Sequence, residues 1–198
     1  MASVVDICNE AMDLLGADTI TSLTESSKVA RLCNRRFESA RNSVIRAHPW
    51  NACIRRIEIA ADSTPPAFGF SHQFTLPTDP HCERVISFWN EEVDNELSAY
   101  DSPSMFKIEG RKILSNQGTC KITFLARITD TEEYDSLLRS TIAYRLAAET
   151  AYAITASTSV TSAIENLYRD RLKEARSIDA MEGVPEQIIA DDFINIRF

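Results

Sequence analysis

Hydrophobic residues recur with two different periods along this chain, and the change of period divides it into parts. Towards both ends, apolar side chains return every three or four residues, which predicts amphipathic helices. Between about residues 50 and 129, apolar and polar side chains alternate instead, which predicts strands. Because helices from both ends flank a single block of strands, the pattern predicts an α+β fold.

The first helix is expected over residues 4–15. Ser3 and Asp6 form a capping signal at its start, although Asp stands where Glu is usual. Gly16 is expected to end it, because glycine readily adopts the left-handed conformation that closes a helix.

The second helix is expected over residues 27–47. It should end where His48 precedes Pro49, because the residue before a proline is pushed out of the helical conformation. One stripe of this helix should be buried, and its arginines should lie off that stripe. The stripe contains Val29, Cys33, Phe37, Ala40 and Val44.

Six strands are expected in the middle of the chain, separated by turn signals. They span residues 54–60, 70–76, 84–89, 104–109, 112–115 and 119–128. The last one alternates most clearly, with Leu125 as the exception. Such alternation is typical of an antiparallel sheet with one buried face.

Helical periodicity returns at Asp130, which forms a capping-box-like pair with Glu133, and it continues to about residue 156. Ser162 and Glu165 either cap a further helix or lie inside one that begins nearer Ser159. The periodicity closes near residue 183.

These boundaries predict a helical bundle built from both chain ends, an inserted antiparallel β-rich domain and an extended C-terminal tail. The helical body would comprise residues 1–49 and 130–183, the inserted domain 50–129, and the tail 184–198. The tail is too apolar to be free in solvent, so it should dock on its own subunit or on a partner.

Charge is unevenly distributed. The net charge is −8, yet residues 28–56 contain eight Lys and Arg side chains against the single Glu38. That segment is therefore +7, and the remainder of the chain is −15. The asymmetry favours association with other copies of the chain or with an oppositely charged partner, and it leaves contact with nucleic acid open.

The five cysteines are odd in number and scattered, which fits a reducing compartment and not a disulfide framework. No apolar run approaches the roughly 20 residues of a membrane span, and residues 1–6 lack the basic start of a signal peptide. We therefore expect synthesis in a cytoplasm and no membrane partner.

Catalytic chemistry has only weak candidates. Cys82 beside His81, or Cys53 near His48, could form a nucleophilic pair, but no third orienting group is suggested. His72 and the other histidines lack the closely paired ligands of a zinc site. Adjacent carboxylates occur at 91–92 and 191–192, as a glycosidase could use, but acidic surface loops are commoner. We expect no cofactor and no enzyme activity.

Two segments carry a family resemblance when taken together. They are FESARNSVIRAHPWN at residues 37–51 and LYRDRLKEARSIDAMEGVP at residues 167–185. With LPTD at residues 76–79 and the chain length, their order and spacing resemble the tail tubular protein A family. These proteins are the head-to-tail adaptors of short-tailed bacteriophages. The resemblance extends over nearly the whole chain, but its separate motifs are short.

The resemblance implies a structural connector in the virion tail, assembled in the host cytoplasm. Copies would form a ring, dodecameric as in the family, between the portal protein and the tail nozzle protein. Double-stranded DNA would pass through the ring without sequence-specific binding. A polysaccharide- or cell-wall-degrading hydrolase and a general DNA-binding protein are the alternatives.

Two sets of residues are candidates for contacts with partners. Trp50, where helix gives way to sheet, is expected to be an apolar plug or a subunit contact. In the separate segment 171–183, Asp179 is expected to be solvated or to contact a neighbour. The subunit and portal candidates are Arg31, Arg35, Arg41, Arg46, Trp50, Arg171, Arg176, Ile188, Ile189, Phe193, Ile194, Ile196 and Phe198. The nozzle candidates are Glu91, Glu92, Asp94 and Tyr100.

Overall fold

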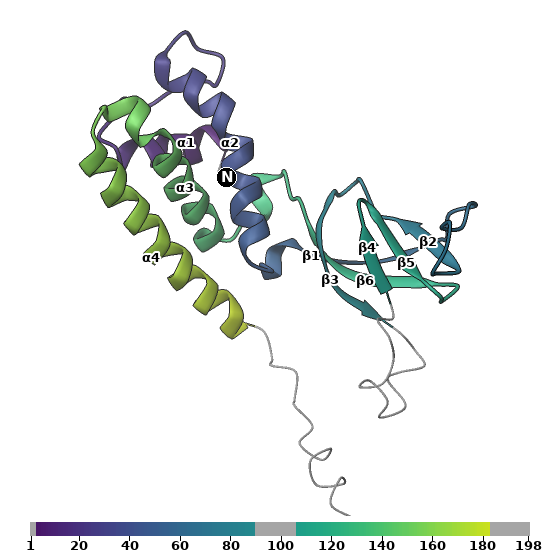
Figure 1. The fold of residues 1–198 in the computed structure, drawn as a ribbon. Helices are drawn as coiled ribbons and strands as arrows, with labels where there is room; N and C mark the ends of the chain where they lie inside the picture. Colours follow the sequence, from purple (N-terminus) through teal and green to yellow (C-terminus); the bar gives the residue numbers. More distant parts are fainter. Residues whose placement is uncertain (1–2, 90–105, 183–198) are drawn as a thin grey trace, which may run out of the picture.

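The fold is mixed α+β, as the change of period predicts. The computed structural model describes residues 3–89 and 106–182 (Figure 1). This described part contains four α-helices and two three-stranded antiparallel sheets. The helices gather at one end of the molecule and the sheets at the other (Figure 1).

Helix α1 (Val4–Asp13) begins with the predicted cap. The Ser3 hydroxyl accepts the Asp6 backbone N–H at 3.2 Å, and the Asp6 carboxylate accepts the Ser3 backbone N–H at 2.7 Å. The helix ends two residues earlier than expected, because a turn leads into Gly16, whose φ of +63° suits glycine.

Helix α2 (Lys28–Ala47) agrees with the prediction at both ends. The Ser27 hydroxyl caps it by accepting the Ala30 backbone N–H at 3.0 Å. His48 takes an extended conformation before Pro49 and ends the helix. The expected inner stripe is buried, except that Val29 is only half-buried.

The predicted start of the third helix at Asp130 is wrong. Asp130 instead caps a short 3-10 turn (η2, Thr131–Glu133) by accepting the Glu132 backbone N–H at 2.9 Å. Helix α3 (Ser136–Thr155) begins after Asp135, whose carboxylate accepts two backbone N–H groups at 2.7 Å. Two aspartates five residues apart offer the same signal, and the later one caps the helix.

Helix α4 (Thr158–Glu182) resolves the alternative at Ser162. This residue lies inside the helix, where its hydroxyl donates to the Thr158 carbonyl at 2.9 Å. Ala156, with a φ of +53°, separates α3 from α4. Helix α3 packs against α1, α2 and α4, so elements from both parts of the chain meet around it.

The first sheet has the strand order β1-β6-β3 and the second β2-β5-β4. A short 3-10 turn, η1 (Asn51–Cys53), leads from α2 into β1. The strands are β1 (Ile54–Ile59), β2 (His72–Thr75), β3 (Cys82–Trp89), β4 (Phe106–Glu109), β5 (Lys112–Ser115) and β6 (Cys120–Ala126). The expected beginning of the fourth strand, at residues 104–105, lies outside the described residues.

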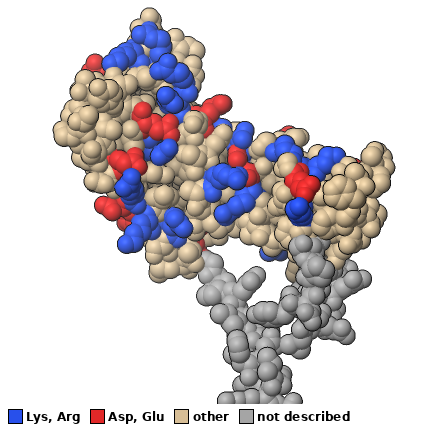
Figure 2. Space-filling view, in the orientation of Figure 1, with Lys and Arg blue, Asp and Glu red and all other residues tan. Residues whose placement is uncertain are grey.

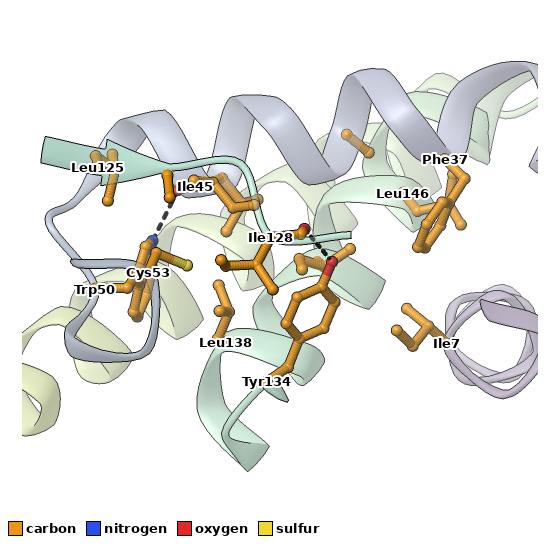
Figure 3. Packing of buried hydrophobic residues seen from close by; sticks show 14 of the residues in the cluster. Ile7, Phe37, Ile45, Trp50, Cys53, Leu125, Ile128, Tyr134, Leu138 and Leu146 are labelled. Carbon is orange, nitrogen blue, oxygen red and sulfur yellow. Dashed lines mark hydrogen bonds between the residues drawn. The ribbon is translucent and has the colours of Figure 1, made fainter. Parts of the chain in front are cut away.

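A continuous core joins the helices to the first sheet (Figure 3). Alternate residues of β6 are buried as predicted, and Leu125 is also buried, close to Ile45 of α2 (Figure 3). Beyond β6, the Tyr134 hydroxyl donates to the Ile128 carbonyl at 2.8 Å and pins the link to α3. The core thus holds α2, β6 and α3 together.

Candidate interaction surfaces

Four exposed cations crowd the N-terminal half of α2, and we name them the α2 patch. Its members are Lys28, Arg31, Arg35 and Arg36. Within the described part of the chain, none of these side chains takes part in an ion pair or a hydrogen bond. Figure 2 shows Lys and Arg side chains gathered at this end of the molecule. The spacing of the four residues places them on one side of the helix.

The α2 patch is electrostatically unfavourable by itself. Its members repel one another, and Lys28 and Arg31 lie in the first turn of the helix, where the macrodipole disfavours positive charge. The first turn of α2 contains no acidic residue that could offset them. A binding partner that carries negative charge would relieve this repulsion.

In the C-terminal half of α2, the arginine side chains have partners within the subunit. Arg41 is only 6% exposed; its Nε donates to the Asn42 side chain at 3.0 Å, and its guanidinium lies 5.9 Å from the centre of the Phe37 ring. The prediction that Arg41 contacts another subunit is therefore wrong, because its side chain is enclosed by its own fold. Arg46 is exposed, but its guanidinium donates to the Glu83 carbonyl and ties α2 to β3.

Trp50 is a buried plug, as one of the two predicted roles requires. It is 0% exposed, and its indole N–H donates to the Val44 carbonyl at 2.9 Å. The edge of the His48 ring packs against it, with the ring centres 4.9 Å apart (79° between planes). The alternative role as a subunit contact is wrong, because no part of this side chain reaches the surface.

A hydrogen-bonded corner beside Trp50 was missed by the sequence analysis. His48 Nε2 lies 2.9 Å from Asp179 Oδ2, and the Asn51 backbone N–H donates to Asp179 Oδ1 at 3.1 Å. The Asn51 side chain also donates to the Asp179 carbonyl at 2.7 Å. Asp179 is expected from the sequence to be solvated or to contact a neighbour, but it is 4% exposed. Its spacing from Tyr168 and Ala175, both buried in α4, was the available signal.

The arginines of α4 also differ from one another. Arg171 is half-buried; it donates to the Ser140 hydroxyl at 3.0 Å and pairs with Glu174 at 2.9 Å. Arg176 is exposed and pairs with no described carboxylate. Of these two, Arg176 is therefore the one left available for a partner.

The outer face of the sheet β1-β6-β3 carries a shallow hollow of about 470 Å³. Polar and charged side chains of Arg56, Glu58, Lys121 and Thr123 line much of it. Trp89 at its rim is 56% exposed, which is unusual for so large an apolar side chain.

Two groups of predicted contacts cannot be placed. The nozzle candidates Glu91, Glu92, Asp94 and Tyr100 lie outside the described residues. The apolar candidates of the tail lie outside them as well, and these are Ile188, Ile189, Phe193, Ile194, Ile196 and Phe198.

The cysteines are poorly suited to nucleophilic catalysis. All five are buried and none is in a disulfide. Burial raises the pKa of the Cys53 and Cys120 thiols to about 12 and also raises the pKa of Cys82, which disfavours the reactive thiolate. Beside Cys82, His81 lies 3.0 Å from the Arg111 guanidinium, and partial burial together with that charge lowers its pKa.

Searches of the described residues find no group of three or more His, Cys, Asp and Glu side chains arranged to hold a metal ion. Among the same residues, no helix has the length and apolar character to cross a membrane. Comparison of the chain with models of protein families and with curated proteins finds no match.

Proposed function

We propose that this chain is a structural head-to-tail connector subunit of a short-tailed phage. Copies form a ring between the portal and the tail nozzle, and the ring continues the DNA channel. In this proposal the subunit is a helical bundle from both chain ends with an inserted β-rich domain and a C-terminal tail. The resemblance of residues 37–51, 76–79 and 167–185 to the tail tubular protein A family supports it.

The α2 patch is the observation that carries the proposal. Four exposed cations without partners destabilise an isolated subunit slightly, and contact with an anionic surface would reverse that effect. The rest of the chain is strongly acidic, so neighbouring copies provide such a surface. A ring made of identical subunits would repeat the contact around its circumference.

The described residues give more support to binding than to catalysis. All five cysteines are buried, and burial raises the pKa of the Cys53, Cys82 and Cys120 thiols. The pair of His48 and Asp179 is buried as well, at a corner of the fold. A catalytic group must reach its substrate. The function is therefore proposed to be assembly, without a chemical step.

Mass photometry of the purified full chain, alone and mixed with its portal ring, tests the proposal. A monomer that joins the portal as a ring supports a connector whose assembly is templated by the portal. A ring formed without portal supports a connector that assembles by itself. Absence of association in both samples at physiological salt would reject the proposal.

The α2 patch also favours general DNA binding as a second candidate. Phosphate contacts by four cations would make the affinity fall steeply with salt concentration. Electrophoretic mobility of duplex DNA mixed with the isolated subunit tests this candidate. Tight binding by the monomer, lost between low and physiological salt, would favour it over the connector.

A further inference from the structure

A hollow with a partly apolar lining lies beside the α2 patch. Its volume is about 680 Å³, and it forms where the connection between α1 and α2 meets the C-terminal end of α3. Lys28 belongs both to its wall and to the α2 patch. Its apolar lining comprises Leu15, Ala17, Ile20, Val29 and Ile154. The partly apolar recess and the row of cations therefore meet at Lys28.

The hollow also contains two carboxylates, so its lining is not uniformly basic. Asp18 and Glu25 come from the connection between α1 and α2. The Glu25 carboxylate is occupied locally, because it accepts the Thr21 backbone N–H at 2.9 Å and the Thr21 hydroxyl at 3.1 Å. A fitting ligand is thus partly apolar and places its carboxylates against Lys28 and the rest of the α2 patch, not against Asp18 or Glu25.

The segment 184–198 has this composition. Asp191 and Asp192 stand between two apolar pairs, Ile188-Ile189 and Phe193-Ile194. We infer that the segment 184–198 of a second copy of this chain binds the hollow, with its apolar side chains inside and its aspartates against Arg31 and Arg35. Burial of the apolar side chains would supply most of the affinity, and the ion pairs would fix the orientation.

The length of α4 favours a second copy over the chain's own segment. Helix α4 begins three residues after Thr155, which lines the hollow. The helix runs from there to the opposite end of the helical region (Figure 1). Its 25 residues span about 37 Å at 1.5 Å per residue. Asp192 is ten residues beyond Glu182, and ten extended residues reach at most about 36 Å. The aspartates of the same chain could return to the start of α4 only if all ten residues were fully extended, which favours the segment of another copy.

This inference rests on the proposed ring and specifies how its subunits are joined. A segment leaving one end of a subunit and binding near the other end of the next makes a heterologous contact, which closes into a ring when the rotation allows. It requires no portal. Its failure can therefore be separated from failure of portal binding.

Fluorescence anisotropy with a labelled peptide of residues 184–198 provides the test. The acceptor is the full-length chain carrying Asp191→Lys and Asp192→Lys, which weakens competition by its own segment. We expect saturable binding, at least tenfold weaker after Arg31→Glu and Arg35→Glu are added. A peptide with lysines at 191 and 192 should show the opposite preference between the two acceptors.

Arg56→Glu with Arg84→Glu is the matched control, because it reverses two exposed arginines on the sheets. These changes should leave the affinity within about twofold, since the charges lie far from the hollow. No binding, or equal weakening by both pairs of changes, would overturn the inference. So would duplex DNA binding that depends on Arg31 and Arg35 while peptide binding does not.

Zero-length carbodiimide cross-linking of wild-type chains distinguishes the two origins of the segment. Equal amounts of ¹⁴N- and ¹⁵N-labelled full-length chain are mixed, cross-linked and digested. Links from Lys28 to Asp191 or Asp192 are expected to join peptides of different isotope. Links confined to peptides of the same isotope, or the absence of links at Lys28, would show that a second copy does not bind there.

Discussion

The two ends of α2 contain similar residues but differ in how these are used. At the N-terminal end, Arg31 and Arg35 are exposed and have no described partner. At the C-terminal end, Arg41 is enclosed. Just beyond that end, His48 and Trp50 are buried, with His48 Nε2 bonded to Asp179 and the Trp50 indole N–H bonded to the Val44 carbonyl. The comparison separates residues that hold the subunit together from residues available to join it to something else.

Trp50→Ala, just beyond the C-terminal end of α2, should have the largest effect on the free energy of unfolding. Removing a fully buried tryptophan is expected to lower the free energy of unfolding by about 3–5 kcal/mol, since it leaves a cavity and an unpaired Val44 carbonyl. Urea denaturation followed by circular dichroism measures the change. Trp89→Ala is the matched control and should cost less than about 1 kcal/mol, because Trp89 is 56% exposed. Equal effects would contradict the assigned burial.

Asp179→Ala should have the next largest effect on the free energy of unfolding, because it removes the carboxylate of α4 that bonds to His48 and Asn51. His48 Nε2 and the Asn51 backbone N–H would each lose their partner. A loss of about 1–3 kcal/mol is expected for buried polar groups left unsatisfied. Hydrogen exchange should become faster near the end of α4 while α1 stays protected. Unchanged exchange in α4 would show that the corner does not hold that helix.

Arg41→Ala and Arg35→Ala compare the two ends directly. Arg41→Ala should lower the free energy of unfolding by about 1–2 kcal/mol, because it removes a hydrogen bond, a cation–π contact and buried methylene groups. Arg35→Ala should change it by less than about 0.5 kcal/mol. Thermal unfolding of both variants at one ionic strength is sufficient. If Arg35→Ala proved equally destabilising, the α2 patch would have a role within the subunit.

Local patterns were enough to predict most helices and strands. They did not predict which arginines of α2 are exposed and which are enclosed. The caps at Ser3 and Ser27 and the stop at His48 depend on neighbouring residues, so they can be read from the sequence. The burial of Arg41 depends on tertiary packing, which its neighbours in the sequence do not indicate. Asp179 meets His48 across 131 residues of sequence, and only folding brings them together. The predicted start of α3 was wrong because two nearby aspartates carry the same capping signal, and the later one caps the helix.

The smallest expected effect concerns Cys53, which lies two residues after Asn51 of the hydrogen-bonded corner. Burial raises the pKa of its thiol to about 12, whereas the unfolded chain has a thiol near the ordinary value of 9.0. A pKa raised by folding gives stability that is complete below pH 9 and is lost as the pH rises, because only the unfolded thiol ionises between pH 9 and 12.

Between pH 8 and 9.5, Cys53 should therefore lower the free energy of unfolding by up to about 1 kcal/mol. Comparing this decrease in the wild type and in Cys53→Ala isolates the contribution of one thiol from that of other titrating groups. The decrease should be smaller in the variant. The same decrease in both proteins would mean that solvent reaches Cys53 in the folded state. The C-terminal end of α2 would then be more open than its contacts indicate, and the contrast with the α2 patch would be one of charge alone.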